Sequence, residues 1–168
     1  MSNQVNFVIT RTVHAPSELV FKVFTKPEHL KNWWRNKGFE MNVTKLDHLR
    51  PGGLFHFSQK TPDGQEMWNK FVYREVDEPE KLAFINSFSD EEGNTIRAPF
   101  HPTYPLEILN TLSFTEKEGK TTITMRVGPF SATEEELQTF EGGLESAQKA
   151  FAVLFDQLED YLVSAVSF

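Results

Sequence analysis

The chain has 168 residues, sixteen of them phenylalanine, a net charge of −7 and no cysteine. This length is enough for a single domain, residues 1–168, whose core is large enough to be stable without a bound metal ion or disulfide bonds. The absence of cysteine excludes disulfides, thiolate metal sites and cysteine catalysis, and the acidic charge argues against nucleic acid as a partner. The sequence shows neither a signal peptide nor a membrane-spanning stretch, so we expect a cytoplasmic protein with no membrane insertion.

The N-terminal part predicts one strand and a first short helix. Residues alternate as a strand from Val5 to Val13. Pro16 suits the first position of a helix because proline there loses no hydrogen bond. Apolar residues then recur at helical spacing: Leu19, Val20, Val23 and Phe24.

A second short helix is predicted around Pro27. Thr25 and Glu28 can form a capping box there, and the helix would end at Trp33-Trp34. We expect the tryptophan pair to pack this helix on the end of the sheet. A ligand gate is the alternative reading of the pair.

Six further strands follow in hairpin succession. Their turns are signalled by glycine and proline at 50–53, 62–64, 78–80 and 118–120. The predicted strands span residues 39–44, 54–59, 67–76, 82–89, 106–115 and 121–127. Strands joined by short turns favour an antiparallel meander, and the first strand can pair with the last.

The stretch from Asp90 to Pro105 is irregular and too long for a hairpin turn. It carries side chains that can meet a ligand: Arg97, Phe100, His101 and Tyr104. Long irregular connections in compact domains are often lids, so we expect this stretch to form the rim of a pocket. A proline-stiffened surface loop is the alternative.

One long amphipathic helix is predicted from Thr133 to about Ala165. Thr133 and the acids after it form a capping box. The apolar face repeats at steps of three and four: Leu137, Phe140, Leu144, Ala147, Phe151, Leu154, Leu158 and Tyr161. Gly142-Gly143 lies within this helix and invites a local bend or a close approach. We therefore expect the first half of the helix to border a pocket and the half from Phe151 onward to be solid core.

The element order predicts an α+β fold. A curved antiparallel sheet of about six to seven strands would wrap around the long C-terminal helix, with two short helices after the first strand, a helix-grip fold. Whether the helix closes a core or roofs a cavity is the functional question.

The sequence resembles the START-like superfamily, also called SRPBCC or birch-pollen-allergen-like, and within it the AHSA-type domain, named after the activator of a heat-shock chaperone's ATPase. The matching stretches are residues 15–21 (APSELVF), 33–34 (WW), 49–53 (LRPGG) with Phe55, 78–82 (EPEKL), 105–111 (PLEILNT), 119–122 (GKTT) and 132–136 (ATEEE). The resemblance implies an apolar cavity between the sheet and the C-terminal helix. It also implies one of three roles: binding of lipids or other hydrophobic molecules, polyketide cyclisation, or partnership with a chaperone.

Strand parity places three asparagines among apolar neighbours on the inner face of the sheet, Asn69, Asn86 and Asn110. A buried amide without a partner costs about 1–3 kcal/mol, so each should bind something. A ligand is one possibility and the backbone at strand ends or bulges is the other. Asn69 is the most sensitive to a bulge, because Trp68 and Val72 compete with it for the inner face.

The predicted ligand-binding set combines these asparagines with aromatic and apolar neighbours. It comprises Trp33, Phe55, Phe57, Asn69, Phe71, Phe84, Asn86, Phe88, His101, Tyr104, Asn110, Leu112, Met125, Phe140 and Leu144.

Catalytic motifs are poor in this sequence. The five histidines are dispersed, His56 has outward parity, and neither an HExxH helix nor a GxSxG elbow is present. We therefore predict no metal, no cofactor and no catalytic residue, with His101 as the sole weak acid–base candidate. The expected function is binding of a small hydrophobic or amphipathic molecule by a monomer or homodimer. The alternatives are an enzyme of polyketide-cyclase or hydrolase type using the same pocket, and a co-chaperone-like module that contacts a chaperone or other protein.

Overall fold

The computed structural model describes residues 7–166, with side chains for residues 7–164. Within this range the strands are β1 (Phe7–Val13), β2 (Glu40–Leu46), β3 (Leu54–Lys60), β4 (Glu66–Asp77), β5 (Lys81–Ser89), β6 (Ile108–Lys117) and β7 (Lys120–Pro129). The helices are α1 (Ser17–Thr25), α2 (Pro27–Leu30), α3 (Glu134–Gly142) and α4 (Leu144–Val166). The predicted start of the first strand, Val5, lies outside the described residues.

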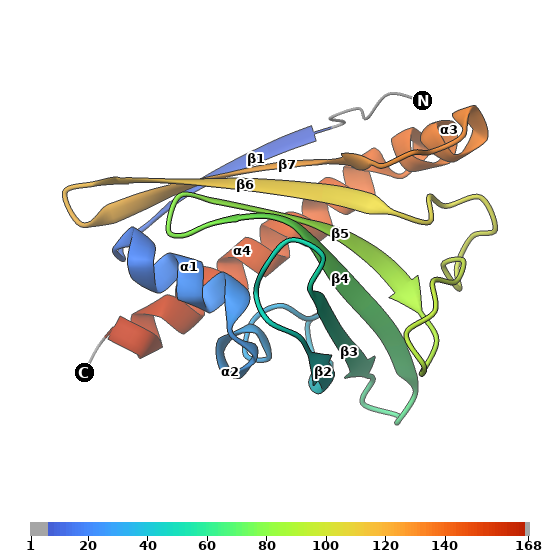
Figure 1. Cartoon of the computed structure of the whole chain (residues 1–168), viewed down its shortest axis with the longest axis horizontal. Coiled ribbons are helices and arrows are strands. Elements are labelled where there is room, and N and C mark those ends of the chain that lie inside the picture. Colours follow the sequence, from blue (N-terminus) through green and yellow to red (C-terminus); the bar gives the residue numbers. More distant parts are fainter. Residues whose placement is uncertain (1–6, 167–168) are drawn as a thin grey trace.

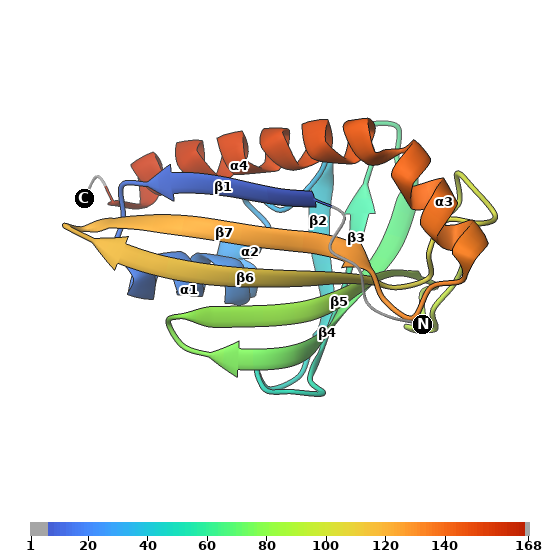
Figure 2. The same ribbon diagram turned by 90° about the horizontal axis from the view of Figure 1, so that it is seen from above.

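The strands form one antiparallel sheet in the order β1-β7-β6-β5-β4-β3-β2. β1 is separated from the meander by α1 and α2, and it pairs with β7 so that Phe7 lies opposite Val127. The sheet curves around α4, with α1 and α2 on the same side (Figures 1 and 2). The predicted α+β class and the seven-stranded helix-grip arrangement are confirmed.

The C-terminal helix is broken rather than continuous. α3 begins with the predicted capping box, in which Glu136 N–H donates to Thr133 Oγ1 and Thr133 N–H donates to Glu136 Oε1. It ends at Gly143, whose N–H bonds the carbonyls of Thr139 and Phe140, and α4 starts at Leu144. The long C-terminal helix is confirmed in α4, but the local bend expected at Gly142-Gly143 is a complete break that makes α3 a separate helix.

The predicted capping box at Thr25 is also wrong. Thr25 is buried, and its hydroxyl donates to the Phe21 carbonyl inside α1. Lys26 therefore occupies the N-cap position of α2, without a side-chain hydrogen bond. A threonine that bonds the carbonyl four residues earlier extends the preceding helix instead of starting the next one.

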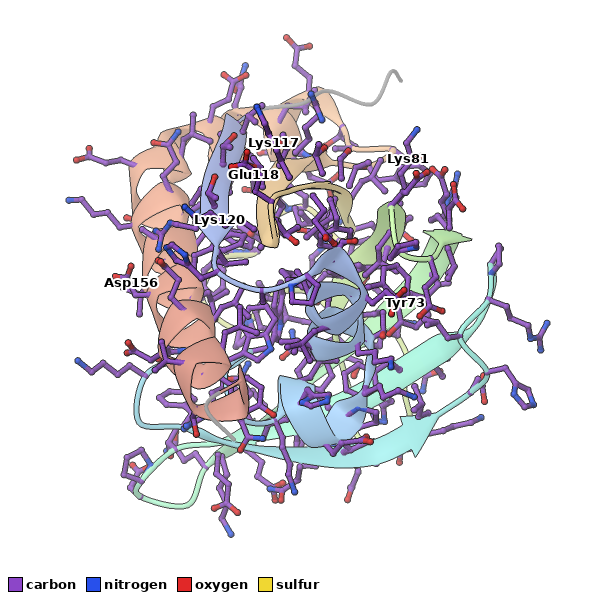
Figure 3. All side chains as sticks on the ribbon, turned by 90° about the vertical axis from the view of Figure 1, so that its left-hand side faces the viewer. Tyr73, Lys81, Lys117, Glu118, Lys120 and Asp156 are labelled. Carbon is purple, nitrogen blue, oxygen red and sulfur yellow. The ribbon has the colours of Figure 1, made fainter. Side chains whose placement is uncertain are left out.

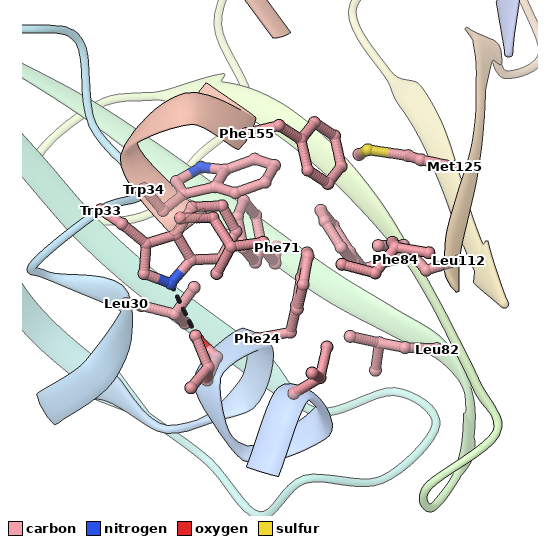
Figure 4. Close-up of a cluster of buried hydrophobic side chains, with 14 of the residues drawn as sticks. Phe24, Leu30, Trp33, Trp34, Phe71, Leu82, Phe84, Leu112, Met125 and Phe155 are labelled. Carbon is pink, nitrogen blue, oxygen red and sulfur yellow. Dashed lines mark hydrogen bonds between the residues drawn. The ribbon is translucent and has the colours of Figure 1, made fainter. Parts of the chain in front are cut away.

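Aromatic side chains fill the middle of the groove between sheet and helices (Figure 4). Trp34 packs edge-on against Phe71 and Phe84, with ring centroids 5.5 and 6.0 Å apart. Trp33 is fully buried, and its indole N–H donates to the Val23 carbonyl at 3.0 Å. The tryptophan pair thus packs the α2 region on the sheet, as the first reading of that pair predicts.

The two ends of the molecule differ. At one end the β6–β7 turn carries Lys117, Glu118 and Lys120 (Figure 3). At the other end α3 lies beside the connection of residues 90–107 between β5 and β6 (Figures 1 and 2), which we call the β5–β6 loop. No helix within residues 7–166 is long and apolar enough to cross a membrane. Two pockets of the described chain include residues of this loop.

Candidate functional site

An open pocket of about 580 Å³ lies between the β5–β6 loop and the junction of α3 with α4; we call it the apolar pocket. It is lined by Phe100, His101, Tyr104, Thr139, Phe140, Gly142, Gly143, Ser146 and Ala147. The two glycines that break the helix leave their side of the wall without side chains. The helix break thus forms part of the pocket wall, and the pocket's volume falls within the usual range for small-molecule sites.

A second pocket, of about 270 Å³, lies between α4 and the inner face of β3, β4 and β5; we call it the polar pocket. It is lined by Trp34, Arg35, Asn36, Gln59, Met67, Asn69, Asn86, Phe88, Phe100, Phe151 and Leu154. Amide and guanidinium groups form much of its wall, whereas aromatic rings and α4 form the remainder. It lies inside the groove that the sheet makes with α4.

Phe100 is the residue that lines both the apolar and the polar pocket. Its ring lies 5.8 Å from that of Phe88 and 4.9 Å from that of Tyr104, and Tyr104 in turn lies 6.1 Å from Phe140. Phe100 is 65% exposed, the second most exposed large apolar side chain after Val163 among the described residues. The two cavities thus share one largely exposed aromatic side chain.

The β5–β6 loop is fastened to α3 by polar contacts. Arg97 forms an ion pair with Glu136 and also donates to the Tyr104 carbonyl at 3.1 Å. The hydroxyls of Thr103 and Thr139 lie 2.7 Å apart in a hydrogen bond. These contacts hold the loop against the first turns of α3, so the outer wall of the apolar pocket has a defined position.

The contact with Arg97 also affects the pKa of Glu136. Burial alone would raise the pKa of the carboxyl group, but the hydrogen bond from the Thr133 backbone and the hydrogen bond and charge of Arg97 outweigh it. The pKa is therefore lowered below its ordinary value. Glu136 therefore stays ionised at neutral pH, and its ion pair with Arg97 continues to link the loop to the helix.

The other end of the loop is fastened to the outer face of the sheet. Lys70 Nζ donates to the Gly93 carbonyl at 3.0 Å, and His56 Nε2 lies 3.1 Å from the Asp90 carbonyl. His56 is buried, and its Nδ1 lies 2.5 Å from the Thr44 hydroxyl. Its predicted outward parity is confirmed, but the loop covers it, so this histidine positions the loop and does not reach either pocket.

The three asparagines predicted on the inner face do face inward. Asn69 and Asn86 line the polar pocket, and Asn86 Oδ1 is buried with no hydrogen-bond donor among the described residues. Asn110 is 1% exposed and donates to the Ile108 carbonyl at 3.2 Å, whereas its own oxygen lacks a donor in the described part of the chain. Two asparagines thus belong to a pocket, and the third is held by backbone.

The titratable groups of the apolar pocket are His101 and Tyr104. Burial raises the pKa of Tyr104 to about 12, so its phenol stays protonated and can only donate or accept a hydrogen bond. His101 Nδ1 accepts from the Thr103 N–H at 3.1 Å. Among the described residues that line this pocket none is a carboxylate, and no three metal-binding side chains lie together within residues 7–166. The pocket is built for contact and hydrogen bonding.

The structure distributes the predicted ligand-binding residues over three places. His101, Tyr104 and Phe140 line the apolar pocket, and Asn69, Asn86 and Phe88 line the polar pocket. Leu144 is half-buried and packs on the core. The others are buried in the interior: Trp33, Phe55, Phe57, Phe71, Phe84, Asn110, Leu112 and Met125.

The lining residues outside the predicted set carry different signals. Phe100 stands in the predicted rim, and Gly142-Gly143 lies in the half of the helix that was predicted to border a pocket, so a sequence signal existed for both. Gln59 stands in β3 two residues after Phe57, so strand parity predicts its inward side. Arg35 and Asn36 carry no such signal, because strand parity says nothing about residues between a helix and a strand. Phe151 and Leu154 show that the solid half of the helix begins about one turn later than predicted, at Phe155.

The fold of this chain occurs in several solved structures. A protein from Arthrobacter aurescens is 20% identical over 97% of this chain and 91% of that chain, with a TM-score of 0.78. Protein Ms6760 from Mycobacterium smegmatis is 24% identical over 96% of both chains, with a TM-score of 0.71. The AHSA1 protein from Silicibacter pomeroyi is 14% identical over 95% of this chain and 98% of that chain, with a TM-score of 0.67.

A search among curated proteins found no match. The model of the family described as "Activator of Hsp90 ATPase homolog 1-like protein" matches residues 14–162. This range contains α1, every strand from β2 to β7, and nearly all of α4. The chain therefore belongs to the family of activator of Hsp90 ATPase homolog 1-like proteins.

Proposed function

We propose that this protein binds a small hydrophobic or amphipathic molecule at the apolar pocket, between the β5–β6 loop and the junction of α3 with α4. The observation that carries this proposal is the pocket itself, about 580 Å³ with aromatic rings on one side and Gly142-Gly143 on the other. Pockets of this size, mostly apolar and with a few polar groups, are typical of small-molecule sites. His101, Thr139 and Ser146 supply those polar groups.

The surroundings support a preformed site. Arg97 and Thr103 fix the loop to α3, so little ordering is needed when a ligand arrives. Phe100 presents a largely exposed ring at the edge, a position that suits contact with an incoming apolar molecule. The high pKa of Tyr104 and the lack of a carboxylate among the described lining residues favour binding over acid–base catalysis.

Titration with a neutral fluorescent probe, N-phenyl-1-naphthylamine, tests the proposal. Ala147 lines the apolar pocket, so Ala147→Phe should fill part of it and weaken probe binding about tenfold or more. Ala150 is exposed on the same helix and lines neither pocket, which makes Ala150→Phe the matched control. We expect saturable binding to the wild type and to Ala150→Phe.

Equal affinity of the two variants would place the probe elsewhere and overturn the proposal. The same would follow from a wild type that shows no saturable binding. Thermal unfolding followed by circular dichroism checks that both variants keep the fold. The comparison is balanced, because each variant introduces the same side chain into the same helix.

A further inference from the structure

Arg35 is a cation without a matching charge. It is half-buried in the wall of the polar pocket, and its Nη1 donates to the Phe39 carbonyl at 2.6 Å. Its Nε is buried with no acceptor among the described residues, and no described carboxylate lies within salt-bridge distance of it. A guanidinium offers five donors in a rigid fork, and a buried donor left unpaired is costly. Arg35 therefore lines the pocket with hydrogen-bonding capacity that no described acceptor uses in full.

The backbone around Arg35 is held in place by α4. Gln157 Nε2 donates to the carbonyls of Trp33 and Arg35, at 2.8 and 2.9 Å. Trp33 is itself locked in the core by its bond to Val23. The backbone that carries the guanidinium group is thus held in place, so a ligand need not order this segment when it binds.

Neutral donors surround the same space. Gln59 Oε1 accepts the Asn36 N–H at 2.9 Å, which leaves the Gln59 NH₂ group as a donor. Asn69 and Asn86 face the pocket from neighbouring strands. The unpaired Asn86 oxygen can exchange places with its NH₂ by rotation about the last side-chain bond, so this amide can also donate. One cation and several amide donors form a site for a small anion.

The charge and the volume of the polar pocket limit which anion fits. Arg35 is the one charged residue among its described lining residues, and the cavity measures about 270 Å³. A carboxylate carries a single charge and matches the guanidinium fork with two parallel bonds. A phosphate monoester would bring a second charge without a partner in this wall, which is unfavourable in a buried site.

We infer that the polar pocket binds the carboxylate of an amphipathic monoanion, whose apolar body passes Phe100 into the apolar pocket. This inference rests on the proposed function, since it assigns the apolar body to the same site. Phe100 contacts both cavities, so a molecule that spans them must lie against its ring. The ligand class is thus a carboxylic acid with one apolar chain or ring system, bound as its anion.

Isothermal titration with three ligands of equal chain length tests the inference: octanoate, 1-octanol and octyltrimethylammonium. We expect octanoate to bind about ten- to a hundredfold more tightly than the alcohol, the contribution of a charge-assisted hydrogen bond, and the cation to bind most weakly. Arg35→Gln should remove the advantage of octanoate over octanol. Lys37→Gln, two residues along the same segment and exposed, removes the same charge outside the pocket and should retain that advantage.

The outcomes of these titrations separate the carboxylate site from the proposed function. Equal binding of octanoate and octanol to the wild type would overturn the carboxylate site and leave the proposed function standing. An equal loss in Arg35→Gln and Lys37→Gln would also overturn it, because a general field would then explain the preference. Absence of binding by all three ligands, together with no binding of the neutral probe, would overturn both. If Arg35→Gln fails to fold, the wild-type comparison still decides.

Discussion

Glu136 performs two structural tasks with one carboxylate. Its Oε1 accepts the Thr133 N–H and completes the capping box of α3, and its Oε2 receives Arg97 from the β5–β6 loop. The side chain is 8% exposed, whereas that of Arg97 is 47% exposed. A single residue therefore links the start of the helix to the loop that forms the outer wall of the apolar pocket.

Replacing Glu136 by glutamine should lower the free energy of unfolding at neutral pH by about 1 kcal/mol, because the charge-assisted bond to a half-exposed arginine is lost. The pKa of Glu136 is lowered in the folded protein, so its contribution is complete above the ordinary value of 4.5 and disappears as the pH falls through the lower folded value. The difference between wild type and Glu136→Gln should thus shrink between about pH 5 and pH 3. Urea unfolding at several pH values measures it.

Glu135→Gln is the control for this titration. Glu135 is an exposed acid in the same first turn of α3, so its replacement changes the helix-dipole interaction without touching Arg97. A stability difference for Glu136→Gln that stays constant across the acid range would contradict the ionic role of Glu136.

Individual site residues differ in how far the sequence predicts them. The inward parity of Asn69 and Asn86 follows from the two-residue period of a strand, and the structure places both in one pocket. Arg35 follows no such period, since it stands in the turn after α2 and reaches the pocket because α4 binds its backbone. A contact between residues so far apart in the sequence cannot be predicted from the spacing of residues within one strand or helix.

The junction of α3 and α4 forms one wall of the apolar pocket. Gly143 has a φ of −102°, which any residue can adopt, and a side-chain carbon added at Gly142 would meet no atom within 4 Å. Glycine is therefore not needed there for steric reasons. Glycine has a low helix propensity and no side chain, so it weakens the helix here and leaves open space. The low propensity of the two glycines therefore accounts for the break.

Gly142→Ala should raise the free energy of unfolding by about 0.5–1 kcal/mol, because alanine restricts the unfolded chain and fits the helical end of α3. Chemical denaturation measures the change. Gly119→Ala serves as the opposite case, since Gly119 has a φ of +78° in the β6–β7 turn and alanine there should lower stability by about 1 kcal/mol. If Gly142→Ala destabilised the protein, the helix break would depend on a conformation particular to glycine.

Elements that are defined by residues close together in the sequence were predicted correctly. The capping box at Thr133 and the hairpin turns contain all the atoms that define them within a few residues. The Thr25 capping box failed because its hydroxyl had two possible partners, and the carbonyl of Phe21 in α1 holds it. The long C-terminal helix was predicted as one segment because its apolar face continues across Gly142-Gly143, even though its backbone does not.

On the scale of the whole molecule, one part of α4 packs in the core and another part borders a pocket. Phe155, Leu158 and Leu162 are buried where α4 crosses the interior, whereas Phe151 and Leu154 line the polar pocket. The fold class followed from strand order and the family resemblance. The division of α4 into a packed part and a part that borders a pocket could not be predicted, because it depends on how the buried phenylalanines pack in the groove.

This division predicts that stability and ligand binding can be changed separately by the same chemical substitution one turn apart. Leu158 is fully buried, so Leu158→Ala should cost about 2–5 kcal/mol of unfolding free energy. Leu154 is half-buried at the polar pocket, so Leu154→Ala should cost about 1 kcal/mol and alter octanoate affinity several-fold. Urea unfolding and isothermal titration on both variants measure the two effects. A larger stability loss in Leu154→Ala, or unchanged octanoate affinity in that variant, would show that the pocket end of α4 is packed core.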